Sequence, residues 1–317
     1  MVSCHGQVAE RSEDLLDVKV LITGAGGMLG SDLAAKLATT YDVIGIGRRP
    51  APHLNVPYRI ANVTDGKVVQ AFMEAEKPQI VLHAAAMTDV DGCQTDRLGA
   101  LAGNFEATRN VTEAANRVGA LVVFFSTDFV LDGEKTEPYQ EEDLPHPFSV
   151  YGETKLLAER YLHLRAKRFL ILRTSWTFGE HGNHFLKKVL KKAEKGEPLQ
   201  VVSDQRGNPT YTADLADAVK KILEVALAEN KNRNLENQIY HLTNEGPVSR
   251  YELTRWILHR KNYPLHLVVP VTSDQVSYPA ERPKNSVLST EKAGKTFGIK
   301  MRTWQEAVEA YFEESGL

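Results

Sequence analysis

The chain has 317 residues, of which 42% are hydrophobic and 25% are charged, and its formal net charge is −3. This composition is typical of a globular protein with one large or two interlocked domains. It lacks the basic field of a nucleic-acid surface, and no apolar run approaches the roughly 18 residues of a membrane span, so we expect neither kind of partner.

The first segment, residues 1–17, is polar and has no apolar stretch of the kind found in signal peptides. We therefore expect a flexible tail and a cytoplasmic protein. Cys4 and Cys93 are the only cysteines, which favours neither a disulfide nor a thiolate metal site. His181 and His184 lie three residues apart, but no carboxylate or cysteine cluster accompanies them, so we expect no metal.

From Val18 onward, short apolar runs alternate with longer helical patterns. The runs cover 18–25, 41–47, 79–86, 120–128 and 168–176, and the helical patterns begin near Leu29, Asp65, Arg97 and Val150. Buried strands that alternate with helices predict an α/β fold with a doubly wound, Rossmann-like parallel sheet.

After Trp176 the sequence becomes richer in loops and prolines, yet a helix at 212–228 and a strand at 238–243 are suited to rejoin the first sheet. We therefore predict an interleaved arrangement of two domains. The expected NAD(P)-binding domain covers 18–178 with 212–243, and a smaller C-terminal substrate domain covers 179–211 and 244–317.

The stretch "TGAGGMLG" (23–30) directly follows the first strand and opens a helix with Met28 and Leu29. Gly24, Gly27 and Gly30 allow a tight turn, a close approach to a pyrophosphate and close helix packing, respectively. The helix N-terminus would offer N–H groups to the phosphates. This context predicts a dinucleotide site, although glycines also serve tight turns for geometry alone.

The second strand ends "GIGRRP", with Arg48 and Arg49 where an acidic residue would bind the ribose of NAD. A guanidinium there suits a 2′-phosphate, which favours NADPH, with NADH as the alternative. The alternative is a surface loop with two solvated arginines.

Two further motifs follow in chain order. "STDF" (126–129) ends an apolar strand, so Thr127 and Asp128 should lie at the carboxyl edge of the sheet, where a hydroxyl can bind a carbonyl. Tyr151 precedes Lys155 by one helical turn, and a nearby cation would lower the pKa of the phenol toward general acid catalysis. Capping for the first motif and chance for the second are the alternatives.

These motifs, in this order, resemble those of the extended short-chain dehydrogenase/reductases. The stretches "HAAAMTDVDGCQ", "STDFVLDG", "RTSWTFGEHGNHF", "DQRGNPTYTADLA" and "ERPKNSVLST" narrow the resemblance to the dTDP-4-dehydrorhamnose reductases, from Val18 to Leu317. The resemblance implies an NADPH-dependent reduction of the C4 ketone of dTDP-4-dehydro-6-deoxy-L-mannose to dTDP-L-rhamnose. The expected partner is this nucleotide-diphosphate keto-sugar, and a homodimer is one option.

The resemblance also implies roles for single residues. Tyr151 would be the proton donor, Lys155 would hold the nicotinamide ribose, and Thr127 would bind the carbonyl, with Asp128 as an active-site neighbour. The remaining implied ligands are Thr88, Trp176 and Arg282 around the sugar nucleotide, Ala84, Ala85, Ala86 and Asn104 along the cofactor groove, and Asn62 and Val63 near the adenine.

For Trp176 the simpler explanation is core packing, and for Arg282 it is a surface salt bridge. Asn62 and His184 depart from the family pattern, which usually has Asp and Asn there. Asp89, Asp91 and Asp96 precede a helix, where capping and the helix dipole explain them.

Two rival functions remain open. A nucleotide-sugar epimerase or dehydratase is one, but dehydratases typically carry Glu where this chain has Phe129. The other is an NAD(P)-binding regulatory subunit resembling that of methionine adenosyltransferase, which shares the fold and much of the motif set.

Overall fold

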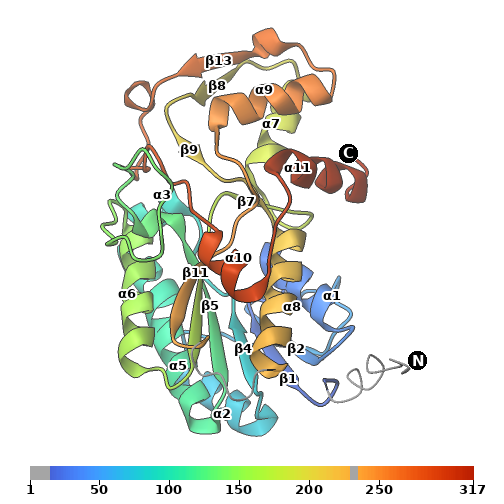
Figure 1. Cartoon of the computed structure of the whole chain (residues 1–317), viewed down its shortest axis with the longest axis vertical. Coiled ribbons are helices and arrows are strands. Elements are labelled where there is room, and N and C mark those ends of the chain that lie inside the picture. The colour runs from blue at the N-terminus through green and yellow to red at the C-terminus, as the bar shows by residue number, and fades with distance from the viewer. Residues whose placement is uncertain (1–14, 229–234) are drawn as a thin grey trace, which may run out of the picture.

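A computed structural model describes residues 15–228 and 235–317 of the chain. Its centre is a seven-stranded parallel sheet in the order β11-β6-β5-β4-β1-β2-β3 (Figure 1). The predicted doubly wound fold is thereby confirmed. The strands are β1 (Lys19–Thr23), β2 (Asp42–Gly47), β3 (Tyr58–Ile60), β4 (Ile80–His83), β5 (Leu121–Thr127), β6 (Phe169–Thr174) and β11 (Gln238–His241).

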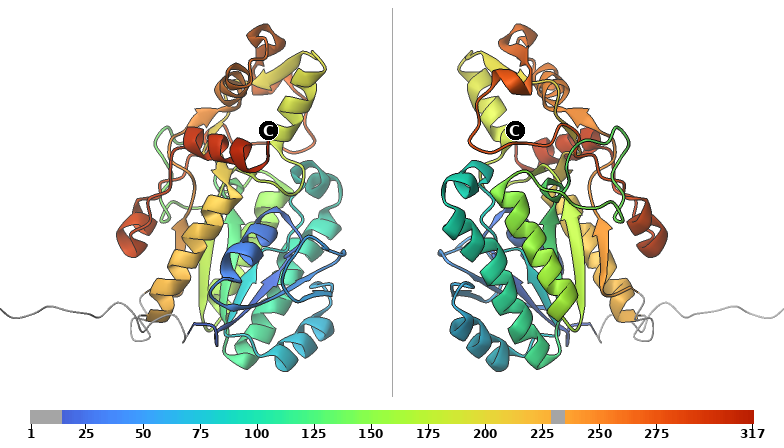
Figure 2. Two further views of the ribbon diagram at one scale, coloured as in Figure 1. Left: turned by 90° about the vertical axis from the view of Figure 1, so that its right-hand side faces the viewer. Right: turned by 90° about the vertical axis from the view of Figure 1, so that its left-hand side faces the viewer.

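Helices cover both faces of this sheet (Figures 1 and 2). Side chains alternate along each strand, so Val20 and Ile22 of β1 join the core on one face and Leu21 joins the core on the other. The first face carries α1 (Met28–Leu37) and α8 (Thr212–Ala228). The second carries α2 (Gly66–Glu76), α5 (Ala107–Val118) and α6 (Val150–Arg165), and the short helices α3 (Val90–Thr95), α4 (Arg97–Ala100) and η1 (Leu101–Glu106, a π-helix) lead into α5.

The direction of winding reverses between β1 and β4, which are neighbours in the sheet but not in the chain. The chain first moves outward to β2 and β3, and then returns to β4 on the other side of β1. Ligands of open α/β sheets bind at the carboxyl edge beside such a reversal. The glycine loop after β1 and the "STD" segment after β5 both lie at this edge.

A smaller unit lies beyond the carboxyl edge of the sheet (Figure 1). It is made of three two-stranded pairs, β7 with β10, β9 with β12, and β8 with β13. Its elements are β7 (Thr177–Phe178), α7 (Phe185–Glu194), β8 (Leu199–Val202), β9 (Arg206–Gly207), β10 (Thr210–Tyr211), β12 (Val248–Ser249), α9 (Arg250–Arg260), η3 (Leu265–Leu267), β13 (Val268–Val271), η4 (Ser273–Gln275) and α11 (Trp304–Glu314).

Two chain segments lie elsewhere than we expected. Helix α10 (Glu291–Phe297), assigned above to the substrate domain, packs against the sheet, because Ala293 and Phe297 join the core beside α8. Of the expected tail, Leu15 packs against the same core. The rest of the tail, residues 1–14 with Cys4, lies outside the described residues. Among the helices in the described ranges, none is long and apolar enough to cross a membrane.

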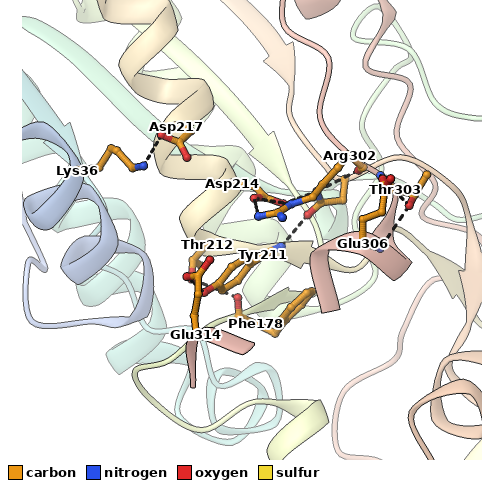
Figure 3. Close-up of polar contacts among 11 residues, drawn as sticks. Lys36, Phe178, Tyr211, Thr212, Asp214, Asp217, Arg302, Thr303, Glu306 and Glu314 are labelled. Carbon is orange, nitrogen blue, oxygen red and sulfur yellow. Dashed lines mark hydrogen bonds and ion pairs between the residues drawn. The ribbon is translucent and has the colours of Figure 1, made fainter. Parts of the chain in front are cut away.

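Polar contacts tie the two units together around α8 (Figure 3). Arg302 donates from Nε to both carboxylate oxygens of Asp214 at 2.9 Å. Within the smaller unit, the Tyr211 hydroxyl of β10 donates to Glu314 of α11 at 2.7 Å. On the other side of α8, Lys36 of α1 pairs with Asp217 at 2.6 Å. Helix α8 is thus fixed both to the sheet and to the segment that carries α11.

Candidate active site

The glycine loop forms a cradle that side chains would fill. Gly24 has a φ of +71°, and a Cβ placed there would lie 2.7 Å from the backbone nitrogen of Ala85. A Cβ on Gly30 would lie 2.2 Å from the carbonyl oxygen of Gly24. Gly27 is the N-cap of α1, and no side chain caps this helix end. The loop therefore leaves backbone N–H groups accessible to a phosphate, which fits a dinucleotide.

The end of β2 presents Arg48 and Arg49 to solvent. Tyr58 of β3 donates its hydroxyl to the carbonyl oxygen of Arg49 at 2.6 Å, and this bond fixes the course of the loop. Asn62 is also exposed, and its side chain accepts a hydrogen bond from the backbone of Thr64. Val63, by contrast, is a core residue. The arginines are thus accessible to a ligand, whereas Val63 contributes mainly packing.

Asn104 is 1% exposed and lies in the π-helix before α5. Its side chain accepts from Met87 N at 2.8 Å, and donates to Met87 O at 3.2 Å and to Thr154 Oγ1 at 3.1 Å. These bonds hold the segment after the half-buried Ala84, Ala85 and Ala86 against α6. Asn104 therefore shapes the groove wall, and its amide is already occupied within the protein.

The start of α6 is locked against the end of β5. Ser149 caps the helix by accepting from Gly152 N at 3.2 Å, and Gln94 accepts from Val150 N at 3.1 Å. A Cβ on Gly152 would lie 2.2 Å from the carbonyl oxygen of Phe129, so the helix and the 3₁₀ turn η2 (Asp128–Val130) are in direct contact. This contact brings Tyr151 to the same edge as Thr127 and Asp128.

Lys155 is engaged by the end of β5, and its charge is not among the causes of the pKa shift of Tyr151. It is 2% exposed, donates to the carbonyl oxygen of Phe125 at 2.6 Å, and lies 3.9 Å from the centre of the Phe124 ring. The expected lowering of the Tyr151 pKa by this cation is therefore not found. Burial raises the pKa of Tyr151, and Asp128 acts in the same direction, while Thr127 opposes the shift.

Burial also changes the proton affinity of the other two titratable groups. It lowers the pKa of Lys155 to about 7, against the influence of Glu159. It raises the pKa of Asp128 to about 6, against hydrogen bonds from Ser286 and Thr127 and the charge of Arg250. Perturbed groups of this kind gather at functional sites, although buried ion pairs in structural positions produce them as well.

A cavity of about 470 Å³ opens beside these groups. It is lined by six of the residues expected around the reaction, together with several polar residues that had not been predicted as ligands. Buried oxygens of Ser126, Asp128 and Thr174 have no hydrogen-bond partner among the described residues. Buried polar groups of this kind are costly unless a ligand or water satisfies them. The predicted residues are Thr88, Thr127, Asp128, Tyr151, Trp176 and Arg282, and the additional polar ones include Ser126, Thr174, Ser175, Lys188, Gln205, Arg250 and Ser286.

Trp176 is not a core residue. It is half-buried, has a φ of +45°, and lies against Gly207, where a Cβ would be 2.6 Å from its Cε2 atom. The guanidinium carbon of Arg250 lies 3.6 Å from the centre of the indole. The indole is thus held between a glycine and a cation, a contact that sequence reasoning missed, because Arg250 stands alone at the start of a helix without any local motif.

Arg282 forms an ion pair in the cavity wall. Its Nη1 and Nη2 atoms donate to the two carboxylate oxygens of Asp91 at 2.8 and 2.6 Å. These hydrogen bonds lower the pKa of Asp91. We expected capping and the helix dipole to explain Asp91. It does lie in the first turn of α3, but its carboxylate also bonds Arg282 from the second unit. Asp96 does cap α4, through Gly99 N at 2.9 Å.

The two histidines diverge. His181 stacks on His53 with ring centres 4.5 Å apart. His184 is buried, and its Nε2 lies 3.3 Å from the hydroxyl of Tyr311. Burial lowers the pKa of His184 to about 4, so its ring is neutral.

The family model for the RmlD substrate binding domain matches residues 18–316. The chain is 36% identical over 297 residues to the spore coat polysaccharide biosynthesis protein SpsK of Bacillus subtilis, covering 93% of this chain and 97% of that protein. It is 35% identical to the dTDP-4-dehydrorhamnose reductase of Aggregatibacter actinomycetemcomitans, covering 93% and 99% of the two chains.

A solved structure is also similar. The dTDP-4-dehydrorhamnose reductase of Bacillus anthracis, in complex with NADP, superposes with a TM-score of 0.84 at 32% identity, covering 94% of this chain and 99% of that one. The similarity therefore extends over both the sheet and the smaller unit.

Proposed function

The chain belongs to the RmlD substrate-binding-domain family, and on this premise we propose that it is an NADPH-dependent dTDP-4-dehydrorhamnose reductase. The reaction is the reduction of the C4 ketone of dTDP-4-dehydro-6-deoxy-L-mannose to dTDP-L-rhamnose. The observation that carries the proposal is the single cavity onto which Thr127, Asp128 and Tyr151 open, beside a glycine cradle at the switch point of the sheet. The relatives' names supply the reaction class.

The residues divide the chemistry among them. NADPH, when bound, supplies the hydride that goes to C4. The ketone oxygen gains charge as its carbon accepts the hydride, and the Tyr151 hydroxyl gives this oxygen its proton. Thr127 now donates to Asp128 at 2.9 Å, and a rotation of its hydroxyl would direct the same donor to the ketone oxygen.

The cofactor side is supported by the shape of the loop and by exposed charge. Gly24, Gly27 and Gly30, with Met28 and Leu29 in the first turn of α1, would hold the pyrophosphate. Arg48 and Arg49 would bind the 2′-phosphate of NADPH. Lys155, freed from Phe125 O, would reach the nicotinamide ribose. Asn62 and the alanines Ala84, Ala85 and Ala86 would line the rest of the groove, and Val63 would pack behind it.

The substrate side of the proposal uses the cavity. Thr88 and Trp176 would contact the sugar, and Arg282 would contact the diphosphate while it remains bonded to Asp91.

We also propose a cytoplasmic location, supported by the buried and unpaired thiol of Cys93. A homodimer through α6 is supported by Leu157 and Leu164, which are 41% and 80% exposed, and light scattering tests it.

The test is a turnover assay with the purified chain, NADPH and the dTDP keto-sugar. We expect loss of NADPH absorbance together with a product whose mass is two hydrogens larger. If the chain binds NADPH but shows no turnover, the result would reject the reductase and favour the NAD(P)-binding regulatory subunit. A product that has lost water or changed only its stereochemistry, with the cofactor recycled, would favour the dehydratase or epimerase.

A further inference from the structure

Arg250 brings a positive charge into the substrate cavity. It is the first residue of α9, and its guanidinium lines the cavity together with Asp128 and Arg282. In the described parts of the chain, no hydrogen bond or ion pair within contact distance engages this guanidinium, whereas Arg282 is bound by Asp91. Burial lowers the pKa of Arg250 to about 10, the charge of Asp128 opposes this shift, and the charge of Arg282 adds to it, so the group stays charged.

Two aromatic rings fix the position of the guanidinium. Its carbon lies 3.6 Å from the centre of the Trp176 indole and 4.7 Å from that of the Phe185 ring. Trp176 has a φ of +45°, which is unusual for a residue with a side chain, and Gly207 lies directly against its indole. Stacking occupies the flat face of a guanidinium and leaves the N–H groups in its plane available to bind a ligand.

The position along the cavity is as informative as the charge. Asp128 follows Thr127 at the end of β5, whereas Tyr278 and Arg282 lie in the segment between η4 and α10, and all three line the cavity with Arg250. Tyr278, Arg282 and Gln205 also line a neighbouring groove of about 1230 Å³, so the cavity opens toward a second, larger space. Arg250 thus lines a cavity that contains both the residues expected around the reacting carbonyl and the residues shared with the larger groove.

A sugar nucleotide has its anionic group at the same place in its own structure. The diphosphate separates the sugar, which reacts, from the nucleoside. We propose that Arg250, presented by Trp176, binds the diphosphate of the substrate on its sugar side, with Arg282 on the nucleoside side. This inference rests on the proposed function for the identity of the ligand. A planar fork with two adjacent N–H groups matches the paired oxygens of a phosphate.

The direct test is equilibrium binding of dTDP and of thymidine, without turnover. Arg250→Gln should weaken dTDP binding by roughly ten- to hundred-fold, the loss typical of a charge-assisted contact, and should leave thymidine binding unchanged. Arg250→Lys keeps the charge and loses the planar pair of N–H groups, so its affinity for dTDP should lie between those of Arg250→Gln and the unaltered protein. Arg255→Gln is the matched control, since Arg255 is an exposed arginine of the same helix that stacks on Tyr251, and it should bind both ligands as the unaltered protein does.

The kinetic test follows the same logic. In the turnover assay, Arg250→Gln should raise KM for the keto-sugar while KM for NADPH stays the same. Equal losses of dTDP and thymidine binding, or unchanged dTDP binding in both Arg250 variants, would overturn the inference. Because dTDP binding requires no reaction, weaker dTDP binding by a chain without reductase activity would keep Arg250 as a diphosphate ligand and reject only the proposed function.

Discussion

The titratable residues around Tyr151 are governed by burial. Each of the three groups shifts toward its neutral form, with the pKa of Tyr151 and Asp128 raised and that of Lys155 lowered. A neutral phenol is the form that a proton donor needs. The Lys155 ammonium donates to the carbonyl oxygen of Phe125. It can influence the phenol only if this hydrogen bond is exchanged for another when ligands bind.

Tyr151→Phe tests the proton donor. Turnover should fall by roughly 10²–10⁴, the usual contribution of a positioned acid, with NADPH affinity unchanged. Tyr161→Phe is the control on the same helix, because it also removes a single hydroxyl, one that donates to Glu113 at the surface. Retention of most of the turnover by Tyr151→Phe would remove this residue from the proton transfer.

Asp128→Asn should change the pH dependence of stability. The raised pKa of Asp128 means that its contribution to folding is present below about pH 4 and is lost as the pH rises through about 6. Asn cannot ionise. The free energy of unfolding of the variant, relative to that of the unaltered protein, should therefore be roughly 2–3 kcal/mol higher at about pH 8 than at about pH 4. Urea unfolding at the two pH values measures this, and a constant difference would contradict the raised pKa.

Arg48→Ala tests cofactor choice. The loss of one charge-assisted contact should weaken NADPH binding by about ten-fold or more and scarcely alter NADH binding. Fluorescence titration of both cofactors measures the effect, and Arg117→Ala, an exposed arginine of α5, is the control. Equal weakening for both cofactors would show that Arg48 does not contact the 2′-phosphate.

At the scale of elements, the site depends on how closely the first turn of α6 approaches η2. The absence of a side chain at Gly152 permits the contact with Phe129 O, and the caps from Ser149 and Gln94 fix the helix start. The helix could not carry Tyr151 to the edge of the sheet if it lay further out.

Gly152→Ala should therefore separate these two elements. The clash with a backbone oxygen should cost about 1–3 kcal/mol in stability and lower turnover, since Tyr151 moves with the helix. Thermal unfolding and the turnover assay measure the two effects. Gly294→Ala in α10 is the control, because its nearest contact would be 3.3 Å. Unchanged turnover in Gly152→Ala would show that the position of α6 is not critical.

The sequence predicted the elements that bury apolar runs and carry local caps. The first five apolar runs and the helices beginning near Leu29, Asp65, Arg97 and Val150 fall at β1, β2, β4, β5, β6, α1, α2, α4 and α6. Strand β3 was missed, because its three residues lie at an edge and are partly exposed. The paired strands of the smaller unit are two to four residues long, too short for a periodic pattern.

The candidate site was predictable only in part, for a related reason. Glycines, "STD" and the Tyr151 and Lys155 pair are local patterns. Arg250 reaches Trp176 because β9 pairs with β12, which joins residues about forty positions apart. The bond between Asp91 and Arg282 spans 191 residues. No local sequence pattern predicts such contacts, so they can be identified only in the folded structure.

At the scale of the whole molecule, the bonds between Arg302, just before α11, and Asp214 of α8 link the smaller unit to a helix that packs on the sheet (Figure 3). The side chain of Asp214 is only 10% exposed, and it also accepts from Asn244 at 2.7 Å. The cavity lies between the two units, so these contacts influence its shape.

Arg302→Ala should remove the main counter-charge of Asp214 and lower the free energy of unfolding by roughly 1–3 kcal/mol. This loss is larger than that for a surface ion pair and smaller than that for a fully buried one. Arg260→Ala breaks the exposed pair with Glu309 and should cost less than about 1 kcal/mol. Urea unfolding compares the two variants. A similar loss of stability in both variants would mean that the ion pair between Arg302 and Asp214 contributes no more than a surface ion pair.

The pairing of β11 with β6 has a consequence for the order of folding. The two strands are neighbours in the sheet, but the whole first part of the smaller unit, 175–211, and α8 lie between them in the chain. During synthesis, β6 therefore remains an unpaired edge until Gln238–His241 has left the ribosome, and an exposed edge of this kind invites pairing with other chains. Helix α8 is complete before that moment, and its early packing on α1 would hold the nascent sheet while the last strand is still missing.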